Sequence, residues 1–357
     1  MGRTRFIRNL EAWAYVEIFL VAAVTTVLGV RLFLDLTGYP QLGVGGLHIA
    51  HVLWGGLLML AALIILLSFL SKAAHRTAAL TGGAGFGLFI DEIGKFVTRD
   101  HNYFFAPAPA LIYAAFILTL LAVHGIRAAR GYSEQEYLMN ALRQMEEVAL
   151  HDLTEEERDR ALWYLERSDP SHPLVPTLRR LVEQAALVPS RPPSWFARGK
   201  RALAAAYRRI SRLPGFTAGV VGLFLFQLGA SLLYAVVLVF FVGLGWERLQ
   251  DMRLFGAAAE RLEHLTFPDA AQLASSAVAG VFTLLGVMRI RRSRLAAFAM
   301  FERSALISIF LTQFFSFYKE QFSALAGLLV NVLILIAVRF VMEQERVAAH
   351  ERVRQRP

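Results

Sequence analysis

Two short stretches place ionisable side chains inside apolar runs that are long enough to cross a bilayer. His48 and His51 lie in one run, and Asp91, Glu92 and Lys95 lie in another. An ionisable group at membrane depth is costly unless it meets a partner, a metal ion or water. These five residues are therefore the first candidates for a functional site.

Imidazole and carboxylate groups are ordinary ligands of transition metals, and the two histidines have the i, i+3 spacing of one helix face. His48, His51, Asp91 and Glu92 are thus candidate ligands of a divalent transition metal such as zinc, iron or manganese. In an enzyme, Glu92 would be the catalytic base acting on a metal-bound water. A structural alternative stays open, in which Asp91 and Lys95 neutralise each other at i, i+4 and the histidines bind loop carbonyls.

Further charged residues are expected at the same level of the membrane. Arg31 and Asp35 are spaced i, i+4 in the preceding apolar run and can pair on one helix face. Asp100 and His101 follow the run that contains Asp91. With Lys95, these four are candidate substrate-binding residues, and Arg31 or Lys95 is suited to an anionic headgroup or a phosphate.

Glycines beside these residues predict close helix packing. Gly55 shares a helix face with His48 and His51, and residues 82–87 are mostly glycine. Positions without a side chain let the backbones of neighbouring membrane helices approach each other. The sequence therefore predicts a compact site.

The composition indicates a membrane protein. Of the 357 residues, 56% are hydrophobic, which exceeds what one soluble core requires. The excess of Lys and Arg lies at the ends of apolar runs, where it orients helices, so we expect a lipid bilayer as the partner and no nucleic acid. No cysteine is present, which excludes disulfides, thiolate metal sites and cysteine nucleophiles.

Runs of about 20 apolar residues predict an all-α, polytopic helix bundle with eight spans in a 4+4 arrangement. The spans are placed at residues 13–36, 46–70, 80–97, 111–126, 216–244, 270–288, 295–317 and 322–340. The predicted parts of the chain are a first four-helix unit with the polar site (1–130), a helical insert (131–213), a second four-helix unit (214–345) and a basic tail (346–357).

The distribution of Lys and Arg predicts the orientation. The loops on the same side as the N-terminus carry most of these residues, which favours the cytoplasm for that side. We therefore expect a multi-pass inner-membrane protein with both termini cytoplasmic, and a site that faces outward.

The insert is expected to form soluble helices on the cytoplasmic side, where it is a candidate surface for a protein partner. Ser133 with Glu136, and Thr154 with Glu157, have the spacing of a capping box at a helix start. The basic stretch before residue 213 is either an amphipathic helix on an anionic membrane surface or a charged connector.

A weak internal repeat relates residues 89–96 to residues 310–317. The aligned polar positions are Asp91 with Thr312, Glu92 with Gln313, and Lys95 with Ser316. The second copy would keep polarity without charge, in a parallel repeat. Chance alignment of two segments rich in Phe and Leu is the alternative.

Three functions are compatible with these patterns. The first is cation or proton-coupled transport, or ion binding, by the outward His and carboxylate site. The second is a membrane-embedded, metal-dependent hydrolase acting on a lipid or periplasmic substrate. The third is a membrane scaffold or signalling protein that uses the insert, with the polar cluster holding the helices together.

Overall fold

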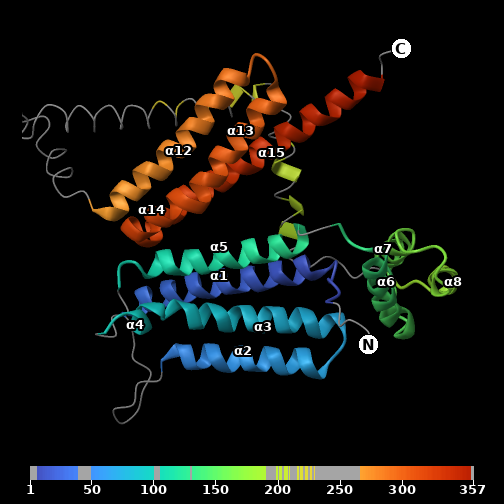
Figure 1. Cartoon of the computed structure of the whole chain (residues 1–357). Coiled ribbons are helices and arrows are strands. Elements are labelled where there is room, and N and C mark those ends of the chain that lie inside the picture. Colours follow the sequence, from blue (N-terminus) through green and yellow to red (C-terminus); the bar gives the residue numbers. More distant parts are fainter. Residues whose placement is uncertain are drawn as a thin grey trace, which may run out of the picture. The chain divides into compact units, whose positions relative to one another are not determined.

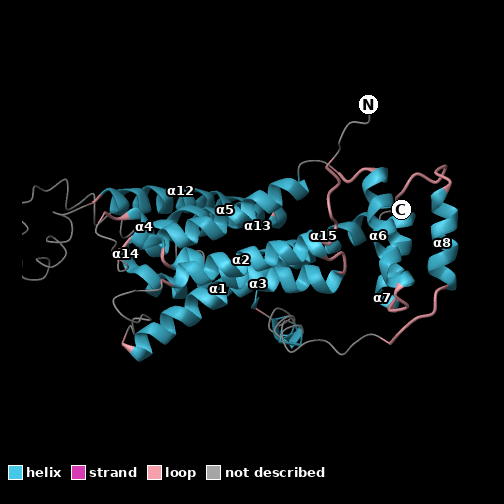
Figure 2. Ribbon diagram, turned by 90° about the horizontal axis from the view of Figure 1, so that it is seen from below, coloured by secondary structure: helices cyan, strands magenta, loops and turns pink. Residues whose placement is uncertain are grey.

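The computed structural model describes residues 6–38, 50–99, 105–128, 131–189 and 266–354, with scattered positions between 198 and 229. The described residues form helices joined by loops, and there is no strand among them (Figure 2). This confirms the predicted all-α class. Contacts group the chain into a first unit, residues 1–103 and 115–194, and a second unit, residues 104–114 and 195–357. The division into four parts expected from the sequence stays a prediction.

Five segments of the described chain are long and apolar enough to cross a membrane. They are Ala12–Thr37, His51–Ser68, Ala108–Ala128, Phe267–Arg289 and Arg294–Glu345. Large apolar side chains such as Leu57 and Leu67 are more than half exposed, as expected of surfaces that face lipid. The chain is thus a multi-pass membrane protein. The expected span at 216–244 lies largely outside the described residues, so the eight-span arrangement stays a prediction.

The first unit is built around one central helix. Helix α3 (Lys72–Asp91) packs against both α1 (Ala12–Thr37) and α2 (His51–Ser68), as Figure 1 shows. A short helix, α4 (Ile93–Val97), follows α3, and α5 (Ala108–Ala128) begins after residues 100–104. The side chain of Ser71 caps α3 by accepting a hydrogen bond from the Ala74 amide at 3.2 Å. The apolar span expected from the sequence begins at Leu80, whereas the helix begins at Lys72, because hydropathy alone omits its charged first turns.

Glycines let the three helices come close. A Cβ added at Gly83 would lie 2.3 Å from the Phe19 carbonyl oxygen of α1, and one at Gly85 would lie 2.7 Å from the Gly55 carbonyl oxygen of α2. Side-chain atoms do not occupy such positions, so both faces of α3 depend on glycine. The expectation of close packing around Gly55 and residues 82–87 is confirmed.

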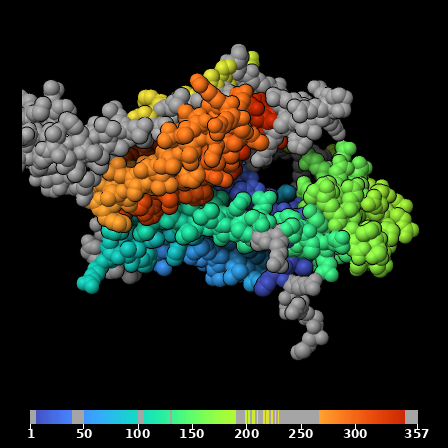
Figure 3. All heavy atoms as spheres, turned by 45° about the horizontal axis from the view of Figure 1, so that its top comes forward, coloured from blue at the N-terminus to red at the C-terminus, as the bar shows by residue number. Residues whose placement is uncertain are grey.

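The insert forms three helices, α6 (Glu134–Ala149), α7 (Glu155–Leu165) and α8 (Leu174–Gln184). The capping boxes expected at the starts of α6 and α7 are present. Apolar side chains of the three helices, including Leu138, Tyr164 and Leu178, form a small core, and the helices make one cluster in Figure 3, coloured green. In Figures 1 and 2 they lie crosswise to α1–α3 at one end of the unit.

Lys72, the first residue of α3, joins the insert to the bundle. Its side chain is almost fully buried, and Nζ lies 2.7 Å from Gln144 Oε1, 3.3 Å from Glu147 Oε1 and 3.2 Å from Glu157 Oε1. A buried ammonium needs such partners, because water is excluded from it. Residues of α6 and α7 therefore hold the start of α3.

The segment before α1 makes a second junction with α6. Arg8 Nε and Nη2 each donate to a carboxylate oxygen of Glu136 at 2.7 Å, and the Leu10 amide donates to Asn140 Oδ1 at 3.0 Å. The hydrogen bonds from Arg8 lower the pKa of Glu136 to about 2. This junction is a bidentate ion pair, the strong form of an arginine–carboxylate contact.

The pKa of Glu136 predicts a pH dependence of this junction. Its folded-state value lies below the ordinary 4.5, so the stabilisation is present above pH 4.5 and is lost as the pH falls from there towards 2. The protection of the α6 amides against hydrogen exchange in the full chain, corrected for the pH dependence of intrinsic exchange, is expected to fall over this range. Glu136→Gln should exchange faster already at neutral pH and change less on acidification. The exposed neighbour variant Glu134→Gln is the control, and a response equal to that of Glu136→Gln would contradict the assignment.

The second unit also has a central helical segment. Helix α12 (Phe267–Arg289) precedes this segment, which consists of α13 (Arg294–Ile307), a π-helical turn η2 (Ser308–Thr312) and α14 (Gln313–Glu320). After the 3₁₀ turn η3 (Gln321–Ala324), α15 (Leu325–Arg354) returns alongside α13, as Figure 1 shows. Phe298, Phe301 and Val338 form the centre of its apolar core.

Candidate functional site

The site lies where α3 is interrupted. Helix α3 ends at Asp91, α4 begins at Ile93, and Glu92 between them has φ −86° and ψ 10°. This backbone conformation is the sparsely populated bridge region, in which active-site residues are often found. The interruption directs two consecutive carboxylates into the protein, since Asp91 is 0% and Glu92 1% exposed.

Asp91 is held by α1 and α2. Arg31 Nε of α1 donates to Asp91 Oδ1 at 2.5 Å, and Arg31 Nη2 donates to the Asp91 carbonyl oxygen at 3.0 Å. The second carboxylate oxygen, Oδ2, lies 3.2 Å from Nε2 of His51, the first residue of α2. Both oxygens of this buried carboxylate therefore face nitrogen atoms.

Glu92 is held by α2 and α4. Lys95 Nζ donates to Glu92 Oε1 at 2.5 Å, and His51 Nδ1 lies 3.5 Å from the same oxygen. The Val52 amide, in the first turn of α2, donates to Oε2 at 3.0 Å. Ala50, at the N-cap of α2, has no polar side chain that could accept a hydrogen bond from the first amides of the helix. Glu92 accepts one instead, and its negative charge is favourable at a helix N-terminus.

His51 occupies the centre of this ionic network, which consists of Arg31, His51, Asp91, Glu92 and Lys95. One ring nitrogen faces each carboxylate. A neutral imidazole has one N–H donor and one acceptor lone pair, so it would turn a lone pair towards one carboxylate. An imidazolium has two N–H donors, one on each ring nitrogen.

Exposure separates the cations from the acids. The side chains of Arg31, His51 and Lys95 are 18%, 21% and 24% exposed, whereas both carboxylates are buried. When His51 is neutral, the formal charges of the other four residues cancel.

The structure brings together five of the nine site residues expected from the sequence. Asp35 is exposed, and the structure pairs Arg31 with Asp91. His48, Asp100 and His101 lie outside the described residues. Sequence reasoning did not foresee the Val52 amide, because a backbone donor has no signature in the residue type.

Within the described residues, no group of three or more His, Cys, Asp or Glu side chains is arranged to hold a metal ion. The expected ligand set included His48, which is not among those residues. The transition-metal site and the catalytic role of Glu92 therefore stay predictions. Comparisons with protein-family models, with curated proteins and with solved structures find no match to this chain.

Proposed function

We propose that this chain is a proton-coupled membrane transport protein, with the coupling proton held at His51 between Asp91 and Glu92. The observation that carries the proposal is that Nε2 and Nδ1 of one imidazole face two different buried carboxylates at 3.2 and 3.5 Å. That arrangement is satisfied by an added proton. Ionisable groups of this kind inside membrane bundles are typical of proton relays.

The network also joins three helices that would have to move relative to one another during transport. Arg31 comes from α1, His51 from α2 and Asp91 from α3. Loss of the proton would leave the lone pair of His51 against a carboxylate and weaken the contact between α2 and α3. Protonation is thereby linked to helix packing, which is what coupling requires. From the charge distribution along the sequence, we place this end of the bundle outward.

The internal repeat predicted from the sequence would give the proposal secondary support. The regular helix is interrupted in both aligned segments. In residues 89–96 it ends at Asp91, and in residues 310–317 a π-helical turn ends at Thr312. The following residues, Glu92 and Gln313, are both buried. Interrupted helices in corresponding positions of two repeats are a feature of transporter binding sites.

Two measurements test the proposal. In the full chain labelled with ¹⁵N-histidine, the His51 signal, assigned by its loss in His51→Gln, should show an imidazolium or a strongly hydrogen-bonded ring at neutral pH. Liposomes containing the protein and an entrapped pH dye should conduct protons under an imposed potential. His51→Gln is expected to reduce that flux at least about tenfold, since the amide cannot carry a proton.

His124→Gln is the matched control, because His124 is exposed on α5 and remote in sequence from the network. Its flux should equal that of the unaltered protein. Equal flux in His51→Gln, or no flux above that of empty liposomes, would contradict the transport proposal.

A structural lock is the second candidate, favoured because each buried carboxylate already has a cationic partner, Arg31 for Asp91 and Lys95 for Glu92. This role corresponds to the scaffold hypothesis. It predicts that His51→Gln lowers thermal stability and leaves the proton flux of the reconstituted protein at the level of empty liposomes.

A further inference from the structure

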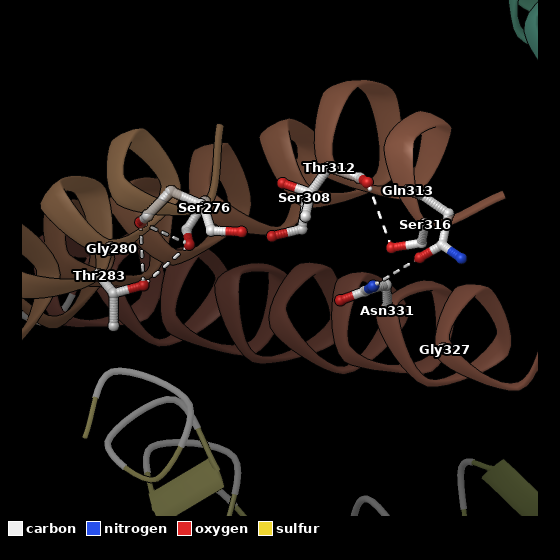
Figure 4. A pocket seen from close by; sticks show the side chains of 11 residues that line it. Ser276, Gly280, Thr283, Ser308, Thr312, Gln313, Ser316, Gly327 and Asn331 are labelled. Atoms are coloured by element: carbon white, nitrogen blue, oxygen red, sulfur yellow. Dashed lines mark hydrogen bonds between the residues drawn. The ribbon is translucent and has the colours of Figure 1, made fainter. Parts of the chain in front are cut away.

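The second unit contains an uncharged polar cavity inside its apolar helices. The cavity has a volume of about 210 Å³ and is lined by 11 residues of α12, α13, η2, α14 and α15, none of them ionisable (Figure 4). Hydroxyl and carboxamide groups supply its polar surface. Membrane helices pack without such a space, so the cavity needs an explanation.

One face of the segment formed by α13, η2 and α14 supplies four of the hydroxyls. Ser304, Ser308, Thr312 and Ser316 are each four residues apart. In a regular α-helix each such step overshoots a full turn by about 40°, so the four would spread around the helix. The π-helical turn at Ser308–Thr312 winds more slowly, because its hydrogen bonds span five residues, and it offsets part of the spread. The turn thus keeps the hydroxyls along one side.

Some of these hydroxyls are already satisfied by the protein. Thr283 and Ser304 are hydrogen-bonded to each other at 2.8 Å, and Ser304 donates to the Ala279 carbonyl oxygen at 2.8 Å. Gln313 donates to the Ala324 carbonyl oxygen at 2.6 Å. These groups form the fixed part of the wall.

Other hydroxyls that line the cavity have no such partner. Among the described residues, Thr312 Oγ1 is inaccessible to solvent and makes no hydrogen bond, and Ser276 and Ser308 make no side-chain hydrogen bond. Leaving a buried hydroxyl unsatisfied is unfavourable, so an occupant that hydrogen-bonds to Ser276 and Ser308 would be stabilised.

The lining restricts the chemistry of that occupant. A charged solute would find no opposite charge among the lining residues, which favours a neutral occupant. Hydroxyl groups both donate and accept, as do the hydroxyls of a polyol. Taking about 30 Å³ per water molecule in the liquid, the volume corresponds to roughly seven waters, which is enough for a short polyol.

A polar path leads from one end of the cavity towards the end of the helices. Ser316 lines the cavity and accepts a hydrogen bond from Gln272 Nε2 at 3.0 Å. Lys319 Nζ donates to Gln272 Oε1 at 3.1 Å and pairs with Asp269 at 2.6 Å. The charges at this end neutralise each other, so they neither attract nor repel a neutral solute.

We propose that the cavity beside the π-helical turn is a binding site for a small uncharged polyol, with Ser276 and Ser308 hydrogen-bonding to its hydroxyls. This inference goes beyond the proton site and does not depend on it, since every residue of the cavity belongs to the second unit.

Saturation-transfer NMR on the full chain in lipid nanodiscs tests the site, with erythritol as the probe and the erythronate anion as its charged counterpart. Erythritol should give a saturable signal and erythronate none. Ser308→Ala removes a hydroxyl that makes no hydrogen bond within the protein, so the protein should fold normally and bind erythritol about fivefold more weakly. Ser276→Ala should have a similar effect.

Thr77→Val is the matched control, because Thr77 is exposed on α3 and its hydroxyl donates to a backbone carbonyl. It should leave erythritol binding unchanged. The proposal is overturned if erythritol does not bind, if Ser308→Ala and Ser276→Ala bind it as well as the unaltered chain does, or if erythronate or sodium ions compete for the same site.

Discussion

Gly55→Ala is expected to lower the apparent melting temperature of the full chain in detergent by on the order of 10 °C. A methyl group at this position would lie 2.7 Å from the Gly85 carbonyl oxygen and from the Phe89 amide nitrogen. Both atoms belong to the backbone of α3 and cannot rotate away, so α2 and α3 must separate. Overpacking of this kind costs about 3 kcal/mol. Tryptophan fluorescence during heating measures the change.

The adjacent glycine provides the control. A Cβ at Gly56 would meet nothing within 4 Å, and alanine favours helix more than glycine does. Gly56→Ala should therefore leave the melting temperature unchanged or raise it slightly. Equal destabilisation by the two substitutions would show that close packing of α2 on α3 is not what Gly55 provides.

Asp91→Asn is expected to lower the free energy of unfolding by about 3–5 kcal/mol, because it leaves a partly buried guanidinium without its anion. Arg31 and His51 both face this carboxylate. Adding Arg31→Met removes the unpaired charge, so the double variant should recover part of the loss. Thermal or denaturant unfolding of the four proteins, in the same detergent, gives the coupling energy.

An exposed ion pair is the comparison for this experiment. Glu155 is 74% exposed and lies 3.9 Å from Arg158, so Glu155→Gln should change stability by less than about 1 kcal/mol. A similarly small effect of Asp91→Asn, or no recovery in the double variant, would show that the ionic network does not hold the helices together.

Hydropathy was sufficient to predict a multi-pass, all-helical membrane protein, because lipid-facing helices must be apolar along most of their length. It was not sufficient for the start of α3. Lys72, His75 and Arg76 lower the local hydropathy, yet the helix includes them. Lys72 is accommodated by Gln144, 72 positions away in the sequence. A window of neighbouring residues contains no information about such a partner.

The same limit applies to the candidate site. Counting residues along each span predicted that Arg31, His51, Asp91, Glu92 and Lys95 share one level, and the structure brings them into contact. The pairs themselves were not predictable, since the i, i+4 spacing also allows Arg31 to pair with Asp35 on its own helix. Its acid is 60 positions away, and the choice depends on how α1 packs against α3. The serine and threonine residues that line the cavity do not stand out in the sequence, and the π-helical turn that aligns their hydroxyls has no sequence signature.

Helix α3 begins in one polar cluster and ends in another. Lys72 is fixed among acids of α6 and α7, and Asp91 is fixed by α1 and α2. A helix of 20 residues is a stiff rod about 30 Å long. A force that displaces the three-helix insert would therefore be transmitted along α3 to Asp91 and to His51 beside it.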